Sequence, residues 1–156
     1  RFQRLVIVAI GVLILTIAFL LPRLFIRPTP IDKRLVVGEK TAFASLTRPY
    51  PIMTDGVATL FIVNTGVELL AFAPYSTGHM LQCRIRWNES RQIFEDACLG
   101  TRYTLLGVWC DGPALRNLDR YPVYIIGEQV RVDLSTVVLG DPTAISQGTA
   151  LAPGCP

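Results

Sequence analysis

The stretch FEDACLGTRY, Phe94 to Tyr103, has the pattern of a strand that runs into a short Cys-x-Gly turn and out again. A cysteine in such a turn raises the question of a metal site, because thiolates are strong ligands for soft metal ions. Cys98 has no histidine beside it, however, and a metal needs further donors. The rest of the chain must therefore show what this turn holds.

The composition indicates a membrane segment. The chain has 156 residues, enough for one globular domain, and 51% of them are hydrophobic, which is high for a soluble domain. The uncharged run Leu5–Leu21 would span about 26 Å as a helix, and about 33 Å if it continues to Ile26. We therefore expect one transmembrane helix over residues 1–26. A buried core helix and a cleaved signal peptide are the alternatives, but no small-residue cleavage site follows the run.

The charge pattern neither indicates nucleic-acid binding nor decides the orientation of the apolar run. The net charge is +3 and the basic residues are scattered, so the sequence gives no support for nucleic-acid binding. Arginines and lysines lie on both sides of the apolar run, and the positive-inside rule therefore does not decide its orientation. After the run, two prolines favour an extended linker over residues 27–34.

The residues after the linker predict a β-domain over residues 35–135. Val57–Val63 and Val67–Ala73 flank a turn at residues 64–66, and Val123–Ile126 and Val130–Leu134 flank a second turn at residues 127–129. Shorter strand-like pieces lie between these hairpins, and no amphipathic helix is evident. We expect an antiparallel all-β domain, a small sandwich or barrel. The tail, residues 136–156, is either a disordered appendage or a strap over the domain.

The segment from Gly78 to Val123 resembles a Rieske iron–sulfur domain of the cytochrome bc type. That family holds one [2Fe–2S] cluster by two cysteines and two histidines, from the boxes C-x-H-x-G-C and C-P-C-H-G-S, with a proline loop beside them. The resemblance reaches from about Val57 to Ser135 and implies a Rieske-like β-fold. It rests on Cys83–Glu89 for the first box, on Phe94, Cys98, Gly100, Thr101 and Tyr103 for the second, and on Gly112–Val123 for the proline loop.

At the four positions where the resemblance places the cluster ligands, this chain carries other residues. These positions carry Gly78, Met80, Asp96 and Leu99. Glycine and leucine have no donor atom, and the methionine thioether is too weak to replace a ligand of a [2Fe–2S] cluster. We therefore expect no cluster, no other cofactor and no metal ion at this site.

The resemblance also implies a disulfide between Cys83 and Cys98, because bc-type domains join the corresponding cysteines. Such a bridge contributes about 3 kcal/mol in the chain-entropy model, and it persists in an oxidising compartment. We therefore expect the domain on the periplasmic or extracellular side of a bacterial cytoplasmic membrane, with the N-terminus inside. Cys110 and Cys155 form a second bridge if the tail folds back; free thiols or a lipid attachment are the alternatives.

The same residues suit two other kinds of site, a mononuclear metal site and a redox switch. His79, Cys83, Asp96 and Cys98 are suitable ligand types for a mononuclear zinc or iron site, provided that the cysteines are reduced. The Cys83–Cys98 pair is alternatively a dithiol/disulfide switch. Asp96 as a general base has no partner at a recognisable spacing, and its neighbour Glu95 would point to the other face of a strand.

The function expected from the resemblance is structural. We expect a non-catalytic accessory subunit of a membrane-bound bacterial respiratory or photosynthetic electron-transfer complex, in contact with the lipid bilayer and with other membrane subunits. A redox or metal protein that uses the atypical site is the alternative. An external module that recruits a soluble electron carrier is a third reading. Fold resemblance alone does not choose between them.

Overall fold

The computed structural model describes residues 34–77, 83–143 and 155. The chain divides after Asp32, and all the described residues belong to the second unit, Lys33–Pro156. None of the helices in the described part is long and apolar enough to cross a bilayer. The expected transmembrane helix over residues 1–26, and the linker except for Arg34, lie outside the described residues.

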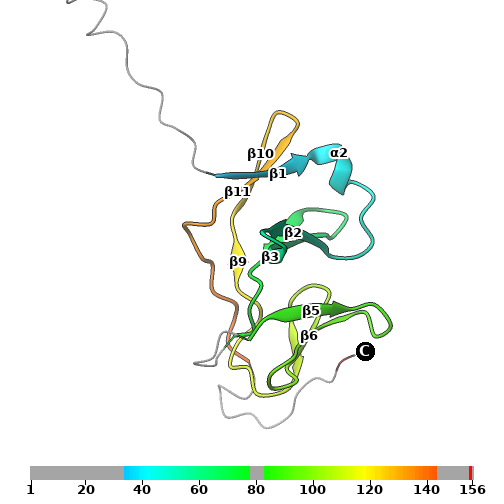
Figure 1. Ribbon diagram of the computed structural model, residues 1–156, viewed down its shortest axis with the longest axis vertical. Helices are drawn as coiled ribbons and strands as arrows, with labels where there is room; N and C mark the ends of the chain where they lie inside the picture. Colours follow the sequence, from blue (N-terminus) through cyan, green and yellow to red (C-terminus); the bar gives the residue numbers. More distant parts are fainter. Residues whose placement is uncertain (1–33, 78–82, 144–154, 156) are drawn as a thin grey trace, which may run out of the picture. The chain divides into compact units, whose positions relative to one another are not determined.

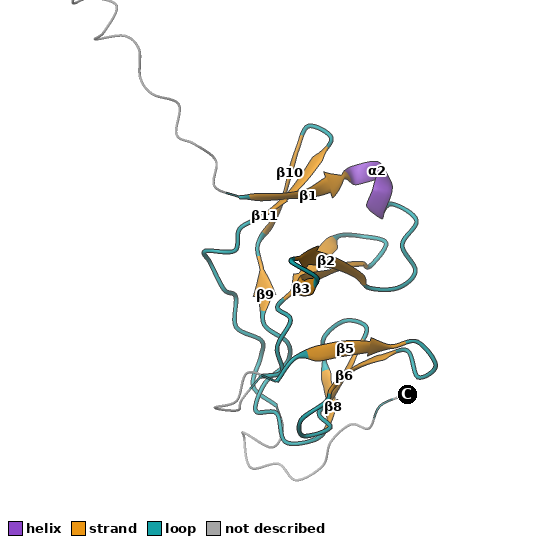
Figure 2. Cartoon of the chain, in the orientation of Figure 1, coloured by secondary structure: helices purple, strands orange, loops and turns teal. Residues whose placement is uncertain are grey.

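The described domain consists mainly of short strands, as Figures 1 and 2 show. The strands are β1 (Leu35–Glu39), β2 (Tyr50–Thr54), β3 (Val57–Asn64), β4 (Leu69–Phe72), β5 (Ile85–Asn88), β6 (Ile93–Asp96), β7 (Arg102–Thr104), β8 (Trp109–Asp111), β9 (Arg120–Tyr121), β10 (Val123–Ile126) and β11 (Gln129–Val132). They form three sheets with the orders β1-β11-β10, β2-β3-β4-β9 and β5-β6-β7-β8. Every pairing between these strands is antiparallel, which confirms the expected antiparallel β-domain.

Strand β3 lies between two hydrophobic cores, which explains the continuous apolar run from Leu60 to Val63. Successive side chains of a strand point to opposite faces, so Phe61 and Val63 enter one core while Leu60 and Ile62 enter the other. In the first core, Phe94 of β6 makes edge-to-face contacts with Phe61 and Trp87, with ring centroids 5.3 Å and 5.1 Å apart. This core fixes β6, and with it the start of the Cys-x-Gly turn.

The first hairpin is β3–β4, but its turn is longer than expected. Asn64 pairs with Leu69, so Val67 lies in the turn and is 97% exposed rather than in a strand. The Thr65 hydroxyl accepts hydrogen bonds from the backbone N–H groups of Val67 and Glu68, a side-chain turn that competes with strand pairing. In the second hairpin, β10 and β11 pair up to Ile126 and Gln129, so that turn is shorter than expected.

A four-residue helix, α2 (Lys40–Phe43), was not indicated by the sequence, because so short a helix has no readable periodicity. Phe43 is buried in the second core. The side-chain amide of Asn64 donates to the carbonyl oxygens of Phe43 and Ala44, at 2.9 Å and 3.0 Å. Tertiary contacts therefore hold this helix in place.

Residues 136–143 form a strap along the loop that precedes β9. Val138 and Arg120 exchange backbone hydrogen bonds of 2.8 Å, and the N–H of Thr143 donates to the carbonyl of Leu115. Leu115 in turn lies next to Arg116, which bridges to Pro142. Backbone hydrogen bonds therefore hold residues 136–143 against the domain.

Candidate functional site

A disulfide joins the two loops that the sequence singled out. Cys83 directly precedes β5, and Cys98 lies in the turn between β6 and β7; their Cα atoms are 5.8 Å apart. Cys83 is 2% exposed, whereas Cys98 is on the surface. The bond therefore links a buried strand end to an exposed turn.

The turn after β6 is folded around the side chain of Asp96. Its Oδ1 atom accepts hydrogen bonds from the backbone N–H groups of Cys98 (3.0 Å), Leu99 (2.7 Å) and Gly100 (3.1 Å). Gly100 has a φ of 70°, a conformation that glycine adopts without strain. Asp96 itself is only 3% exposed. The carboxylate thus occupies the centre of the turn, where it satisfies three backbone donors.

These donors keep Asp96 ionised. Burial raises the pKa of a carboxyl group, but the Leu99 N–H, the nearby hydroxyls of Ser76 and Thr101 and the Cys98 N–H together lower it by more, so the pKa of Asp96 lies below its ordinary value of 3.8. Within the described residues Oδ2 has no hydrogen-bond partner, so the geometry shows the two N–H donors on Oδ1.

The lowered pKa predicts an acid-dependent contribution to stability. A group whose pKa is lower in the folded protein stabilises it above the unfolded pKa, and this stabilisation is lost as the pH falls through the folded pKa. We expect the stability difference between the wild type and Asp96→Asn to be largest near neutral pH and to shrink below the ordinary value of 3.8. Urea unfolding of both proteins across this range measures it; a difference that does not change with pH would contradict the assignment.

A buried hydroxyl cluster ties a second loop to the same end of the domain. The phenol oxygen of Tyr103 lies 2.9 Å from Ser76 Oγ and accepts a 3.0 Å hydrogen bond from the Thr77 N–H. The Thr77 hydroxyl donates to the carbonyl oxygen of Arg116. Tyr103 and Thr77 are 0% and 2% exposed. The chain on either side of the site is therefore held by hydrogen bonds between protein groups.

The loop between β8 and β9 is fixed by an ion pair and by the strap. Arg116 donates two hydrogen bonds to Asp119, Nε to Oδ1 at 2.9 Å and Nη2 to Oδ2 at 2.8 Å. Asp119 Oδ1 also accepts the N–H of Gly140, at 3.0 Å. Trp109 anchors the start of the loop by donating its indole N–H to the carbonyl of Gly112. The ion pair therefore positions the loop.

Gly112 allows this loop to approach the turn after β6. It has a φ of 87°, and a Cβ atom added there would lie 2.6 Å from the backbone Cα of Thr101. Gly112→Ala is therefore expected to lower the free energy of unfolding by about 2–3 kcal/mol, from positive-φ strain plus displaced backbone. Gly127→Ala is the matched control, because Gly127 also has a positive φ but has open space around it. Equal losses in urea unfolding of the two variants would contradict close packing at Gly112.

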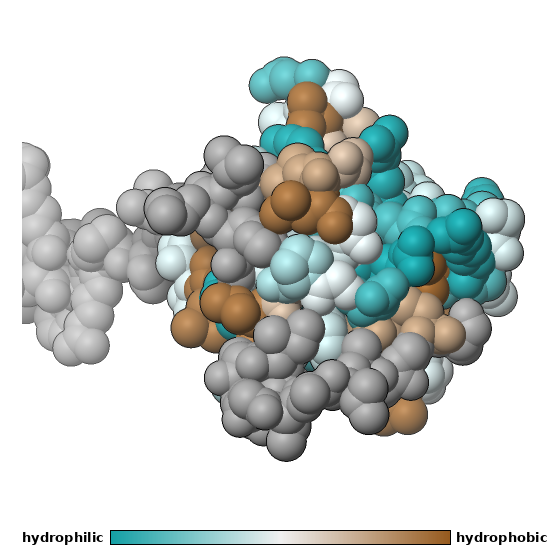
Figure 3. Space-filling view, turned by 90° about the horizontal axis from the view of Figure 1, so that it is seen from below, coloured by the Kyte–Doolittle hydropathy of each residue, from teal (hydrophilic) through white to brown (hydrophobic). Residues whose placement is uncertain are grey.

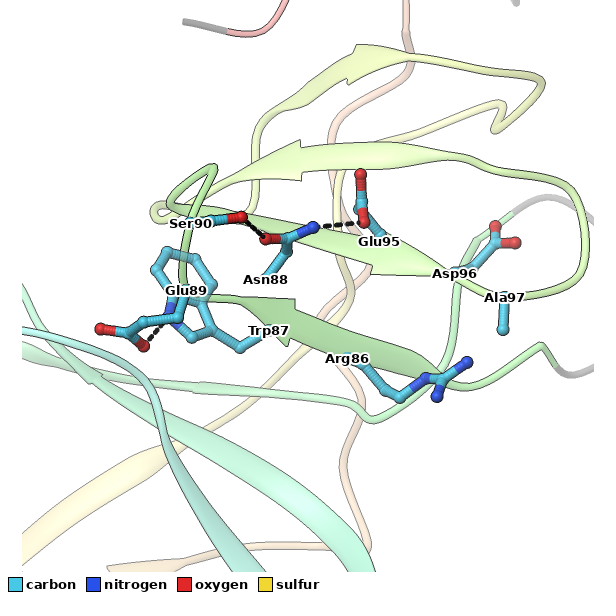
Figure 4. A pocket seen from close by; sticks show the side chains of 8 residues that line it. All are labelled: Arg86, Trp87, Asn88, Glu89, Ser90, Glu95, Asp96 and Ala97. Carbon is cyan, nitrogen blue, oxygen red and sulfur yellow. Dashed lines mark hydrogen bonds between the residues drawn. The ribbon is translucent and has the colours of Figure 1, made fainter.

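The surface hollow beside the site is polar, and both of its glutamates accept hydrogen bonds. It has a volume of about 490 Å³, and its lining, drawn in Figure 4, comes from β5, β6 and the loop between them. Asn88 donates to Glu95 at 2.9 Å, and Trp87 donates to Glu89 at 2.9 Å. The hydrogen bond from Asn88 is the largest contribution to the lowered pKa of Glu95, and Arg91 adds to it. In Figure 4, Asp96 points away from the Asn88–Glu95 pair. These residues do not combine into a base and a nucleophile.

The structure brings together only part of the residues considered for a metal. Cys83, Asp96 and Cys98 have ligand atoms within 4.8 Å of one another. The side chain of Leu99 is 46% exposed, and Gly78, His79 and Met80 lie outside the described residues. Cys110 is bonded to Cys155, with Cα atoms 4.9 Å apart. The sequence did not reveal the role of Asp96, although an Asp two residues before Cys-Leu-Gly is a turn signal of its own.

This site does not fit a [2Fe–2S] cluster. Asp96 Oδ1 is occupied by three N–H groups, Leu99 offers no donor, and the two nearby sulfurs are bonded to each other. A cluster requires four strong donors in addition to its bridging sulfides. Among the described residues, the donors at this end of the domain therefore do not make up the ligand set of such a cluster.

No protein family and no curated protein matches the chain. Among solved structures, it is similar to the cyanobacterial plasma membrane Rieske protein PetC3 from Synechocystis PCC 6803, with 22% identity and a TM-score of 0.48, over 64% of this chain and 98% of that one. It is also similar to the ferredoxin of carbazole 1,9a-dioxygenase from Nocardioides aromaticivorans IC177, with 15% identity and a TM-score of 0.42, over 65% of this chain and 97% of that one.

Proposed function

We propose that the chain is a Rieske-like accessory subunit, without a cluster, of a membrane-bound bacterial respiratory or photosynthetic electron-transfer complex. Its role is structural: it holds neighbouring membrane subunits and neither carries an electron nor catalyses a reaction. The observation that carries the proposal is the Asp96-centred turn, which occupies the position where a cluster ligand is expected and satisfies its own backbone donors.

A domain that has lost its cluster must replace the bonds through which the metal held its loops together. Here the Cys83–Cys98 disulfide joins the two loops, and the Asp96 carboxylate fills the turn. The hydroxyl cluster at Tyr103 binds the preceding loop. Each buried donor that finds an acceptor avoids a penalty of about 1–3 kcal/mol. Protein groups therefore support loops that a metal would otherwise support.

The proposed location follows from the chain's composition and its cysteines. The apolar run at residues 5–21 suits a single membrane-spanning helix, which would contact the lipid bilayer. The domain has two disulfides, which persist in an oxidising compartment, so we place it on the periplasmic or extracellular side with the N-terminus inside.

The surface of the domain offers contacts for neighbours. Large apolar side chains are exposed in the loops that connect β6 to β9, and Figure 3 shows apolar patches interspersed with hydrophilic ones on one face. These exposed side chains are Leu99, Leu106, Val108 and Leu115. A large apolar side chain that is exposed in an isolated domain is available for burial against a neighbouring protein. An accessory subunit is expected to cover them in its complex.

Isolation of the native assembly tests the proposal. The tagged full chain, extracted from its membranes in mild detergent, is expected to co-purify with subunits of an electron-transfer complex and to migrate with them in native electrophoresis. An unrelated single-span protein with the same tag controls for capture by detergent micelles. Migration alone, at the size expected for the 17.2 kDa chain in detergent, would contradict the accessory role.

A further inference from the structure

Three potential metal ligands meet at the disulfide. The sulfurs of Cys83 and Cys98 and a carboxylate oxygen of Asp96 all lie within 4.8 Å of one another. Asp96 is 3% exposed, and within the described residues its Oδ2 atom is buried without a hydrogen-bond partner. Such an oxygen, close to two sulfurs, is a candidate ligand atom for a metal ion.

We propose that reduction of the Cys83–Cys98 disulfide creates a binding site for a thiophilic divalent metal ion such as Zn²⁺. The ligands are Cys83 Sγ, Cys98 Sγ and Asp96 Oδ2, and water completes a tetrahedral shell. Of the three ligands, only Asp96 lies at a position where the Rieske resemblance places a cluster ligand. The proposal does not depend on the accessory role.

The reaction has two steps that balance. A dithiol reductant gives two electrons and two protons to the disulfide, which becomes two thiols while the reductant becomes a disulfide. The metal ion then binds both sulfurs and displaces their two protons into solvent. The Asp96 carboxylate is already ionised, so it releases no proton. In the reverse direction a disulfide oxidant takes two electrons from the two thiolates and, with two protons from solvent, becomes a dithiol; the Cys83–Cys98 bond re-forms and the metal ion leaves.

The local geometry suits this exchange. Oδ1 is fixed by three N–H donors, so the orientation of the carboxylate is set before a metal ion binds. In a tetrahedral zinc site two thiolate sulfurs lie about 3.8 Å apart, an edge that follows from Zn–S bonds of about 2.3 Å. A reductant can reach Cys98 because it is exposed, while the buried Cys83 closes the inner side of the site.

The metal ion compensates the negative charge of its three ligands. Two thiolates beside the Asp96 carboxylate would place three negative charges in a partly buried site, which is unfavourable without a cation. A divalent cation compensates this charge and draws the protons off. Metal binding is thus expected only after reduction, since a disulfide sulfur has no thiolate charge to offer.

Cobalt(II) titration of the full chain, treated with a phosphine reductant that leaves no competing thiol, tests the proposal. The reduced protein is expected to bind one Co²⁺ per chain, with thiolate-to-cobalt charge-transfer absorption that Zn²⁺ abolishes; the oxidised protein is expected to show none. Asp96→Asn is expected to weaken binding at least tenfold. The double variant Cys110→Ala/Cys155→Ala is expected to bind as the wild type does, since its metal ligands are intact.

A second measurement keeps the test independent of folding. Zn²⁺ is expected to slow alkylation of Cys83 and Cys98 at least tenfold in the reduced wild type, as read by peptide mass spectrometry, with near-ultraviolet circular dichroism checking the fold. Absence of the absorption, full binding by Asp96→Asn, or protection confined to Cys110 and Cys155 would each overturn the proposal. None of these outcomes depends on which subunits co-purify, so the accessory role is tested separately.

Discussion

Asp96→Ala is expected to lower the free energy of unfolding by about 3 kcal/mol, because three backbone N–H groups lose their acceptor together. Each orphaned buried donor costs about 1–3 kcal/mol, and the exposed edge of the turn at Leu99 lets water recover part of that. The sum is a large fraction of the stability of a small domain. Urea unfolding of the oxidised full chain measures the loss.

Asp96→Asn is the matched control for this variant. Its side-chain oxygen still accepts the N–H groups, so only the charge is lost and the expected cost is about 1 kcal/mol. Asp133 offers a comparison on the surface, because it also accepts hydrogen bonds from its own turn, at Ser135. Asp133→Ala is expected to cost less than Asp96→Ala. If alanine at position 96 is tolerated as well as asparagine, the carboxylate does not hold the turn.

Loss of the disulfides is expected to produce the other large effect. In the chain-entropy model, the Cys110–Cys155 bridge, with a sequence separation of 45, contributes about 4 kcal/mol. The Cys83–Cys98 bridge, with a separation of 15, contributes about 3 kcal/mol. The double alanine variants at each pair therefore lower the free energy of unfolding by these amounts, with the larger loss at the longer loop. Alanine is preferred to serine because Cys110 is buried.

Comparison of the two double variants separates loop entropy from local packing. The entropy model requires the longer loop to give the larger loss, and both losses should disappear when the wild type is compared with the variants under reducing conditions without metal. A larger loss at Cys83–Cys98 would show that this bridge stabilises the site in the folded state as well. No loss at either pair would contradict the role assigned to the bridges.

Much of the fold could be predicted because the chain carries strong local signals. The apolar strand β3 and its partner β4, and the hairpin β10–β11, were recognisable from β-prone runs that flank turn residues. The limits of these strands were less predictable. Val67 looks like a strand residue, but the Thr65 hydroxyl draws it into the turn. The strap at residues 136–143 depends on contacts with distant residues, which no local pattern encodes.

The sequence identified residues of the candidate site but not the contacts that they make. The sequence indicated that Asp96 and Leu99 stand where cluster ligands are expected, and it paired Cys83 with Cys98 through the Rieske resemblance. Its turn signal at Asp96 did not show that the carboxylate would accept three N–H groups, because that arrangement depends on the burial of β6 through Phe94. The Tyr103 hydroxyl cluster was missed for the same reason, since its partners are about 26 residues away in the chain.

The central claim is that a Rieske-like domain here keeps its loops without a cluster. Iron analysis of the purified full chain, with an electron paramagnetic resonance spectrum after reduction, tests it most directly. A cluster-bearing Rieske protein prepared in the same host is the control. The account predicts no stoichiometric iron and no [2Fe–2S] signal from this chain, whereas the control gives both. Two irons per chain with a Rieske-type spectrum would contradict it.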